Sequence, residues 1–98
     1  MAVINLGTIV VTRGISEWME RSENFRTLVL ITVPLFAEGF WGVLPKEDEA
    51  SNEYAAEHDE RVLGSYPIPK EFGIDRTKFW IITEWNRSVT TILFPDEY

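Results

Sequence analysis

Cysteine is absent from the 98 residues of the chain, and histidine is almost absent. Disulfide bridges and zinc–thiolate sites are therefore excluded. Because secreted domains of this size often depend on disulfides, the lack of cysteine favours a reducing cytoplasm as the place where the protein works. The single His58 lies among acidic residues, and we interpret it as incidental rather than as a metal ligand or a catalytic base.

Long hydrophobic runs are also missing. The longest apolar stretch, 28–37, has about ten residues and is interrupted by Thr32 and Pro34, whereas a helix that crosses a bilayer needs roughly 20. The first residues lack a basic segment followed by a long apolar one. The sequence therefore predicts neither a signal peptide nor a membrane anchor.

Motifs that carry chemistry are missing as well. The chain has no Gly-x-Ser-x-Gly elbow, no phosphate-binding glycine loop and no calcium-binding loop. Glu84 and Arg87 flank a predicted turn, and an ion pair that closes this turn is their simplest interpretation. An enzymatic alternative would need a deep pocket lined by Glu84, Arg87 and Tyr66. We therefore predict that the protein is not an enzyme and has no cofactor or metal ion.

Apolar and aromatic residues, in contrast, are plentiful. Hydrophobic residues make up 45% of the chain, which contains four Trp, six Phe and three Tyr. This is enough apolar volume for one core, and the length is too short for two. We predict a single domain over 1–98.

The pattern of β-branched and aromatic residues predicts four strands at 7–12, 61–68, 77–84 and 88–94. Pro67 and Pro69 lie in or beside the second of these strands and predict an edge of the sheet. A hairpin turn over 85–87 joins the last two strands, with Asn86 suited to a left-handed conformation. The place of the first strand in the sheet is left open.

One helical region is predicted between the first strand and the middle of the chain. It begins with Ser16 as N-cap, is broken near 22–24, and ends before Pro34. The stretch 28–33 also suits a buried strand, but its phase relative to upstream apolar residues favours a helix. Together with a further helix described below, these elements predict an α+β fold: a four-stranded, mainly antiparallel sheet with two to three helices packed largely on one face.

The negative charge of the chain is confined to residues 38–60, which we call the acidic segment. The whole chain has 16 acidic and 9 basic residues, a net charge of −7. The acidic segment holds eight acids and only Lys46, so its net charge is also −7 and the remainder is neutral. A concentrated charge creates a local field that attracts basic surfaces. Because phosphate contacts need clustered Lys and Arg, we expect no direct binding of nucleic acid.

The acidic segment is predicted to form a helix over 46–60, with Pro45 at its start. Four acids at i, i+4, i+8 and i+11 then share one face, and Ala50, Tyr54 and Ala56 are expected to face the core. Such a helix has two interpretations. Its acidic face is either simply solvated or a surface that imitates nucleic acid for a basic protein.

An aromatic loop over 35–41 precedes this helix. Its rings are either part of the core or, where exposed beside the acids, anchors for a binding partner. The predicted partner-binding surface combines the loop and the helix, and consists of Glu47, Asp48, Glu49, Glu53, Glu57, Glu60, Phe36, Phe40 and Trp41.

Several motifs are similar to those of a known family. They are Gly7-Thr-Ile-Val-Val-Thr-Arg-Gly, Gly39-Phe-Trp-Gly, Arg61-Val-Leu-Gly-Ser-Tyr, Thr77-Lys-Phe-Trp-Ile-Ile-Thr-Glu and Asn86-Arg-Ser-Val-Thr-Thr-Ile-Leu-Phe-Pro-Asp-Glu-Tyr. The chain resembles the uncharacterised plasmid-related proteins, which are of similar length and are encoded on bacterial plasmids, integrative elements and prophages. Where that family has an Arg-His pair and a Gly-Asp-Trp-Gly turn, this chain has Leu35, Phe36 and Phe40, so three polar residues are replaced by apolar ones.

The resemblance implies a protein of a mobile genetic element, and small acidic proteins of such elements often inhibit host defence. We therefore expect an anti-CRISPR or anti-restriction protein that binds a basic surface of a CRISPR effector or a restriction subunit. The alternative is a small structural or accessory interaction protein of a plasmid or prophage, a monomer or a homodimer, with no inhibitory activity.

Overall fold

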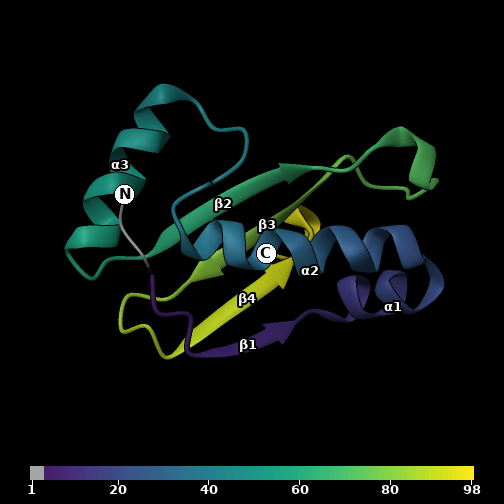
Figure 1. Ribbon diagram of the computed structural model, residues 1–98, viewed down its shortest axis with the longest axis horizontal. Helices are drawn as coiled ribbons and strands as arrows, with labels where there is room; N and C mark the ends of the chain where they lie inside the picture. The colour runs from purple at the N-terminus through teal and green to yellow at the C-terminus, as the bar shows by residue number, and fades with distance from the viewer. Residues whose placement is uncertain (1–3) are drawn as a thin grey trace.

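In a computed structural model of the chain, which describes residues 4–98, four strands form one sheet in the order β1-β4-β3-β2 (Figure 1). Strands β2 and β4 pair antiparallel with β3, whereas β1 pairs parallel with β4. The predicted α+β fold with a mainly antiparallel sheet is confirmed. The strands are β1 (Thr8–Val11), β2 (Val62–Pro67), β3 (Lys78–Thr83) and β4 (Val89–Leu93).

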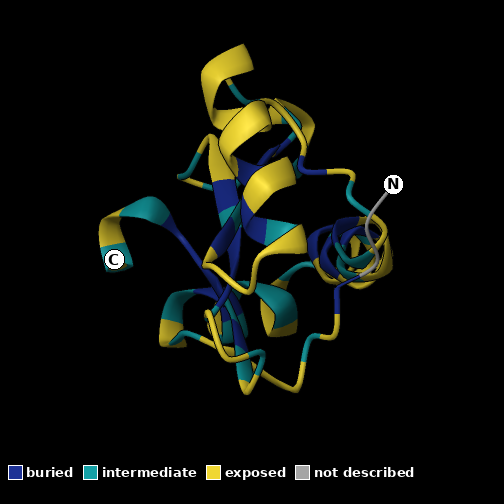
Figure 2. Cartoon of the chain, turned by 90° about the vertical axis from the view of Figure 1, so that its left-hand side faces the viewer, coloured by how far each residue is buried: buried dark blue, intermediate teal, exposed yellow. Residues whose placement is uncertain are grey.

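Three helices accompany the sheet within the described range: α1 (Arg13–Arg21), α2 (Glu23–Ala37) and α3 (Lys46–Glu57). Helices α1 and α2 cover one face, and α3 lies beyond β2 at one end of the sheet (Figure 1). The chain ends on the other face, after a short 3₁₀ turn η2 (Pro95–Glu97), as the view along the long axis shows (Figure 2). None of the described helices has the length and apolar character that a membrane crossing requires.

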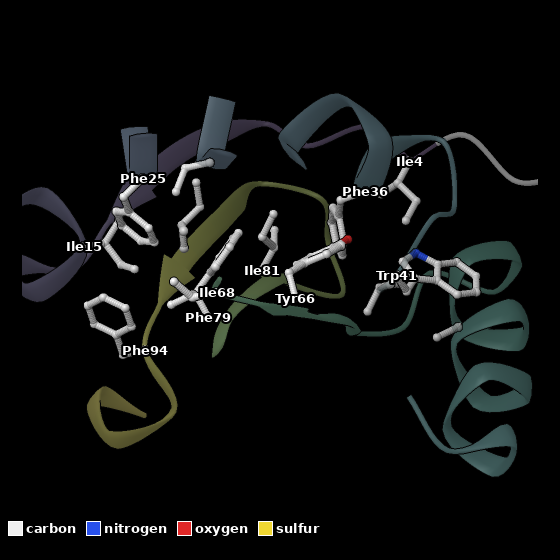
Figure 3. Packing of buried hydrophobic residues seen from close by; sticks show 14 residues of the cluster. Ile4, Ile15, Phe25, Phe36, Trp41, Tyr66, Ile68, Phe79, Ile81 and Phe94 are labelled. Atoms are coloured by element: carbon white, nitrogen blue, oxygen red, sulfur yellow. The ribbon is translucent and has the colours of Figure 1, made fainter. Parts of the chain in front are cut away.

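The core lies between the sheet and α2 (Figure 3). Phe79 and Ile81 point from β3 toward the helices and are fully buried. The ring of Phe25 on α2 meets Phe79 edge-on at a centroid distance of 5.8 Å and stacks on Phe94 at 5.9 Å. Tyr66 continues this row, with its ring 5.5 Å from Phe79. One chain of aromatic contacts therefore joins α2, β2, β3 and the end of β4.

The helical predictions are partly confirmed. The break before α2 lies at Ser22, whose hydroxyl accepts the N–H of Phe25 at 3.1 Å as an N-cap. The predicted N-cap at Ser16 is wrong, because α1 already begins at Arg13. The predicted end before Pro34 is also wrong, because α2 continues to Ala37. Continuing past the proline brings Phe36 into the core, and this burial outweighs the missing hydrogen bond.

The hairpin between β3 and β4 has a different turn geometry from the one predicted. Arg87, not Asn86, is the left-handed residue, with a φ of 58°. The side-chain oxygen of Asn86 instead accepts hydrogen bonds from the backbone N–H of Ser88 at 3.1 Å and from its hydroxyl at 2.6 Å. Asn86 thus stabilises the turn through its side chain, and the left-handed backbone conformation is adopted by Arg87.

The C-terminal turn is tied to the start of α1 by Glu97. Its carboxylate accepts hydrogen bonds from the Thr12 hydroxyl at 2.5 Å, the Gly14 N–H at 2.9 Å and the Phe94 N–H at 3.0 Å. Burial alone would raise the pKa of the Glu97 carboxyl, but these hydrogen bonds outweigh it and hold the pKa below its usual 4.5.

This geometry predicts acid sensitivity that depends on Glu97. Because the folded-state pKa is depressed, the stabilisation is present above the usual pKa and is lost as the pH falls through the folded-state value. We expect Glu97→Gln to lower the free energy of unfolding by about 1–2 kcal/mol at neutral pH. In the variant, the free energy of unfolding should also fall less steeply than in the parent as the pH is lowered. Urea titrations from neutral to acidic pH measure both effects. Glu20→Gln, at an exposed residue, should behave like the parent; an unchanged acid response in Glu97→Gln would contradict the prediction.

Candidate functional site

Helix α3 projects from the body of the protein beyond the edge strand β2 (Figure 1). Only two of its residues, Asn52 and Ala55, are buried. Every acidic residue of the helix is exposed, and so is Glu60. The predicted helix over 46–60 is slightly too long, because α3 ends at Glu57 and Asp59 adopts a left-handed conformation with a φ of 52°. Glu60 therefore belongs to the acidic surface but lies after the helix.

The inward face of α3 differs from the predicted one. Ala50 and Tyr54 were expected to face the core, but both are exposed; Ala56 is only partly buried. Asn52 takes the inward position instead. Its amide Nδ2 donates to the carbonyl oxygen of Leu63 at 2.5 Å, and its Oδ1 accepts the N–H of Leu63 at 3.2 Å. These two bonds satisfy the outward-facing N–H and C=O groups of Leu63 on β2. Helix α3 is therefore rotated about its axis so that Asn52, and not Ala50 or Tyr54, faces the strand.

Arg87, in the β3–β4 hairpin, holds the C-terminal end of α3. Its guanidinium donates to the backbone carbonyl oxygens of Ala55 at 2.9 Å, Glu60 at 2.6 Å and Glu84 at 3.1 Å. A cation at this position also interacts favourably with the negative end of the helix dipole. The predicted Glu84–Arg87 ion pair is wrong, because the carboxylate of Glu84 lies 3.7 Å from Arg61 instead.

The carboxylates of the acidic segment have no basic partners among the residues that the structure describes. None of its eight acids forms a salt bridge with any residue in the range 4–98. Of the eight acids elsewhere, four do: Glu17, Asp75, Glu84 and Asp96. Within this range, the salt bridges therefore involve only acids outside the segment. The negative charge of the acidic segment is therefore exposed to solvent and can attract positively charged molecules.

The three aromatic residues of the predicted surface divide into two that are buried and one that is exposed. Phe36 is fully buried and Trp41 is 6% exposed, so both belong to the core (Figure 3). The expectation that they contact a partner is corrected: they support the surface from beneath. Phe40 is 50% exposed and is the aromatic residue of this loop that a partner can reach.

The loop that carries Phe40 is fixed to β2. The Tyr66 hydroxyl donates to the carbonyl oxygen of Phe40 at 2.6 Å, and burial raises the pKa of this phenol, so it stays protonated. Ser65 bonds to the backbone on both sides of Gly42. A Cβ at Gly42 would lie 1.9 Å from the Ser65 carbonyl oxygen, and its φ is 76°, so only glycine fits there.

A groove of about 720 Å³ lies between the Phe40 loop and α3. The loop contributes one wall, and α3 contributes Lys46, Glu49, Ala50 and Glu53 to the other. An aromatic ring and two carboxylates that face one groove form a suitable receptor for an Arg or Lys side chain, which combines cation–π and ionic contacts. Of the predicted loop and helix residues, Phe40, Trp41, Glu49 and Glu53 line the groove, and Trp41 is almost fully buried. Phe40, Glu49 and Glu53 are therefore the predicted residues available for this contact.

The residues named for an enzymatic alternative do not converge. The Tyr66 hydroxyl is bound to Phe40 in the core, the Glu84 carboxylate lies beside Arg61, and Arg87 is bound to backbone carbonyls. Over residues 4–98, no group of three or more acidic or histidine side chains is placed to hold a metal ion.

Sequence reasoning missed Asn52, Arg87 and Tyr66 as the residues that position the site. Asn52 did give a signal, since it is a poor helix former among alanines and glutamates. No local pattern marks the other two, because the contacts by which they position the site, with Phe40, Ala55 and Glu60, span 26 or more positions in the chain. Comparison of the chain with protein families, with characterised proteins and with solved structures finds no match.

Proposed function

We propose that the protein inhibits a host defence complex, as an anti-CRISPR or anti-restriction protein, by occupying a basic surface that would otherwise bind nucleic acid. The observation that carries the proposal is the set of eight carboxylates without basic partners in the range 4–98, two of which, Glu49 and Glu53, line the groove beside the exposed Phe40. Outside the acidic segment, by contrast, four of the eight acids form salt bridges with the chain's own bases.

The chemistry of this surface suits a partner that binds DNA or RNA. Such partners present clustered Arg and Lys, which contact phosphates. The carboxylates of α3 offer the same charge, steer the approach of the basic surface and set its orientation. Phe40 then supplies an apolar contact of the kind that dominates binding energy at interfaces.

The biological setting is inferred from the sequence motifs. The resemblance to the plasmid-related proteins supports an origin on a mobile element, and the lack of cysteine favours the cytoplasm, where defence complexes act. Replacement of two of the family's polar residues by Leu35 and Phe40, which are both exposed, fits a surface rebuilt to bind a protein, whereas the third replacement, Phe36, lies in the core.

A structural or accessory role on the mobile element is the second candidate function. It is favoured by the apolar edge strand β1, whose residues Ile9, Val10 and Val11 are all exposed. Such a strand is suited to self-association, which fits the homodimeric form of this alternative.

The direct test is binding to purified CRISPR effectors and restriction subunits at low salt, together with inhibition of their cleavage activity. We expect binding that weakens steeply with salt, and competition with nucleic acid. Phe40→Ala should weaken binding by about 10- to 30-fold. Val43→Ala, at a neighbouring exposed apolar residue outside the groove, is the matched control. Absence of binding to every such complex at low salt would reject the inhibitory function.

A further inference from the structure

Strand β1 is an apolar edge of the sheet. All four of its residues are exposed, with Ile9 at 47%, Val10 at 40% and Val11 at 41%. The strand contains no charged residue and no proline. Natural proteins usually protect edge strands with charges, prolines, bulges or a covering segment. None of the first three protects β1, which is therefore a candidate for pairing with another strand.

The backbone of β1 offers hydrogen bonds at this edge. The N–H groups of Thr8 and Thr12 point toward β4, where they donate to Ser88 and Ile92, each at 3.0 Å. Because successive residues of a strand alternate in direction, the N–H and C=O groups of Ile9 and Val11 point away from β4. Outside the β1–β4 ladder, neither residue has a backbone hydrogen bond with any part of the chain from Ile4 to Tyr98.

The opposite edge of the sheet is closed. On β2, the outward N–H and C=O groups of Leu63 are bound by the side chain of Asn52. Those of Ser65 are bound by the backbone of Trp41 and Val43. Pro67 has no N–H to offer. The sheet can therefore be extended at β1 but not at β2.

The distribution of charge indicates that the strand which pairs with β1 comes from a second copy of the chain. Strand β1 lies at the opposite end of the sheet from α3 (Figure 1), so two copies that meet at β1 keep their acidic segments far apart. The chain outside the acidic segment is neutral, and Arg13, next to β1, is paired with Glu17 at 3.0 Å. The edge at β1 thus favours neither an acidic nor a basic strand as its partner. The β1 strand of a second copy of the chain is apolar in the same way and therefore matches it.

We propose that β1 pairs antiparallel with β1 of a second copy around a two-fold axis at Val10. In this register Ile9 faces Val11 of the other copy, and each of the two equivalent pairs exchanges both N–H···O bonds. The side chains of the two Val10 residues meet across the axis as a close, non-hydrogen-bonded pair. Because β2 is closed, growth stops at the dimer, and no open filament forms.

The resulting dimer has a continuous sheet with an acidic helix at each outer end. It presents two copies of the acidic surface to a partner that has repeated or two-fold related basic sites, which strengthens binding without new contacts. The dimer does not rest on the proposed inhibition, and serves a structural role equally well. A four-residue edge buries much less than the roughly 800 Å² per partner of a standard interface, so the dimer should be weak and dependent on concentration.

The test is sedimentation equilibrium of the full chain at concentrations up to about 1 mM, where even weak association is populated. We expect a monomer–dimer equilibrium. Val10→Lys and Val10→Glu place like charges directly opposite each other, and each should raise the dissociation constant of the dimer at least about 10-fold. An equimolar mixture of the two variants places opposite charges across the axis and should restore the dimer. Val43→Lys makes the same change at an exposed valine far from β1 and should leave the equilibrium unchanged.

Each outcome decides the proposal. A parent chain that stays monomeric, a dimer unaffected by Val10→Lys, or a larger open assembly would overturn it. A mixture of folded Val10 variants that fails to dimerise would overturn the register. Circular dichroism confirms that each variant is folded, and recovery in the mixture cannot come from variants that are unfolded.

Discussion

Reversal of Glu49, Glu53 and Glu57 to lysine is expected to abolish binding to a basic partner while the protein stays folded. These residues lie four apart along the exposed face of α3, and the first and second line the groove beside Phe40. The change adds two charge units at each of three positions, which takes the net charge from −7 to −1. It replaces attraction by repulsion at the contact itself, and we expect at least a 100-fold loss of affinity, on the order of several kcal/mol.

The stability of the variant should change little. The three glutamates repel one another along the helix, and three lysines at the same positions repel one another by a similar few tenths of a kcal/mol. None of the three has a salt bridge to lose among residues 4–98. Binding is measured at several salt concentrations, and urea unfolding checks the fold.

The matched control is the reversal of Glu20, Glu23 and Glu71, which are exposed and lie outside the acidic segment. It changes the net charge by the same amount. If the position of the charge matters, this control keeps most of the affinity. Equal losses in both variants would mean that only the total charge is sensed, and an unaffected α3 variant would show that the helix face is merely solvated.

Arg87→Ala is expected to cause a large loss of stability and to loosen α3. The guanidinium donates to three backbone carbonyl oxygens, those of Ala55, Glu60 and Glu84, and no other side chain in the described range replaces it there. Hydrogen bonds from a charged donor contribute about 1.5–3 kcal/mol each in favourable cases, and partial exposure reduces this. We expect a loss of about 3 kcal/mol in the free energy of unfolding.

Urea unfolding measures the loss, and hydrogen exchange shows whether the amides of α3 open first. Arg87→Lys should recover only part of the stability, because a lysine cannot reach several carbonyls with one planar group. Arg26→Ala is the control, since Arg26 is exposed and donates to a single carbonyl oxygen, that of Met19, at 3.0 Å. Similar effects of Arg87→Ala and Arg26→Ala would contradict the assigned role.

The strands and their edges were largely predictable from local residue patterns. β-Branched and aromatic runs bounded by turn residues marked all four strands, and the two prolines marked β2 as an edge. The position of β1 could not be predicted, because its partner β4 begins 81 positions after the start of β1, with Thr8 opposite Val89. A parallel pairing over such a separation leaves no local signal.

The orientation of α3 was mispredicted for a related reason. Alanine and tyrosine were assigned to the core by their hydrophobicity, but the decisive interaction is the amide of Asn52 with the exposed backbone of Leu63. An edge strand with unsatisfied polar groups gains more from an amide than from a methyl group. That gain is visible only when β2 and α3 are seen side by side.

Composition and residue order were enough to establish an α+β chain without cysteine, whose entire net charge lies in residues 38–60. These properties depend on counting and on short-range patterns. Tertiary packing alone settled which aromatic residues are exposed, which acids lack partners and which edge of the sheet is open. Burial and pairing are relations between segments far apart in the chain, so Phe36 and Phe40, four residues apart, end on opposite sides of the boundary between core and surface.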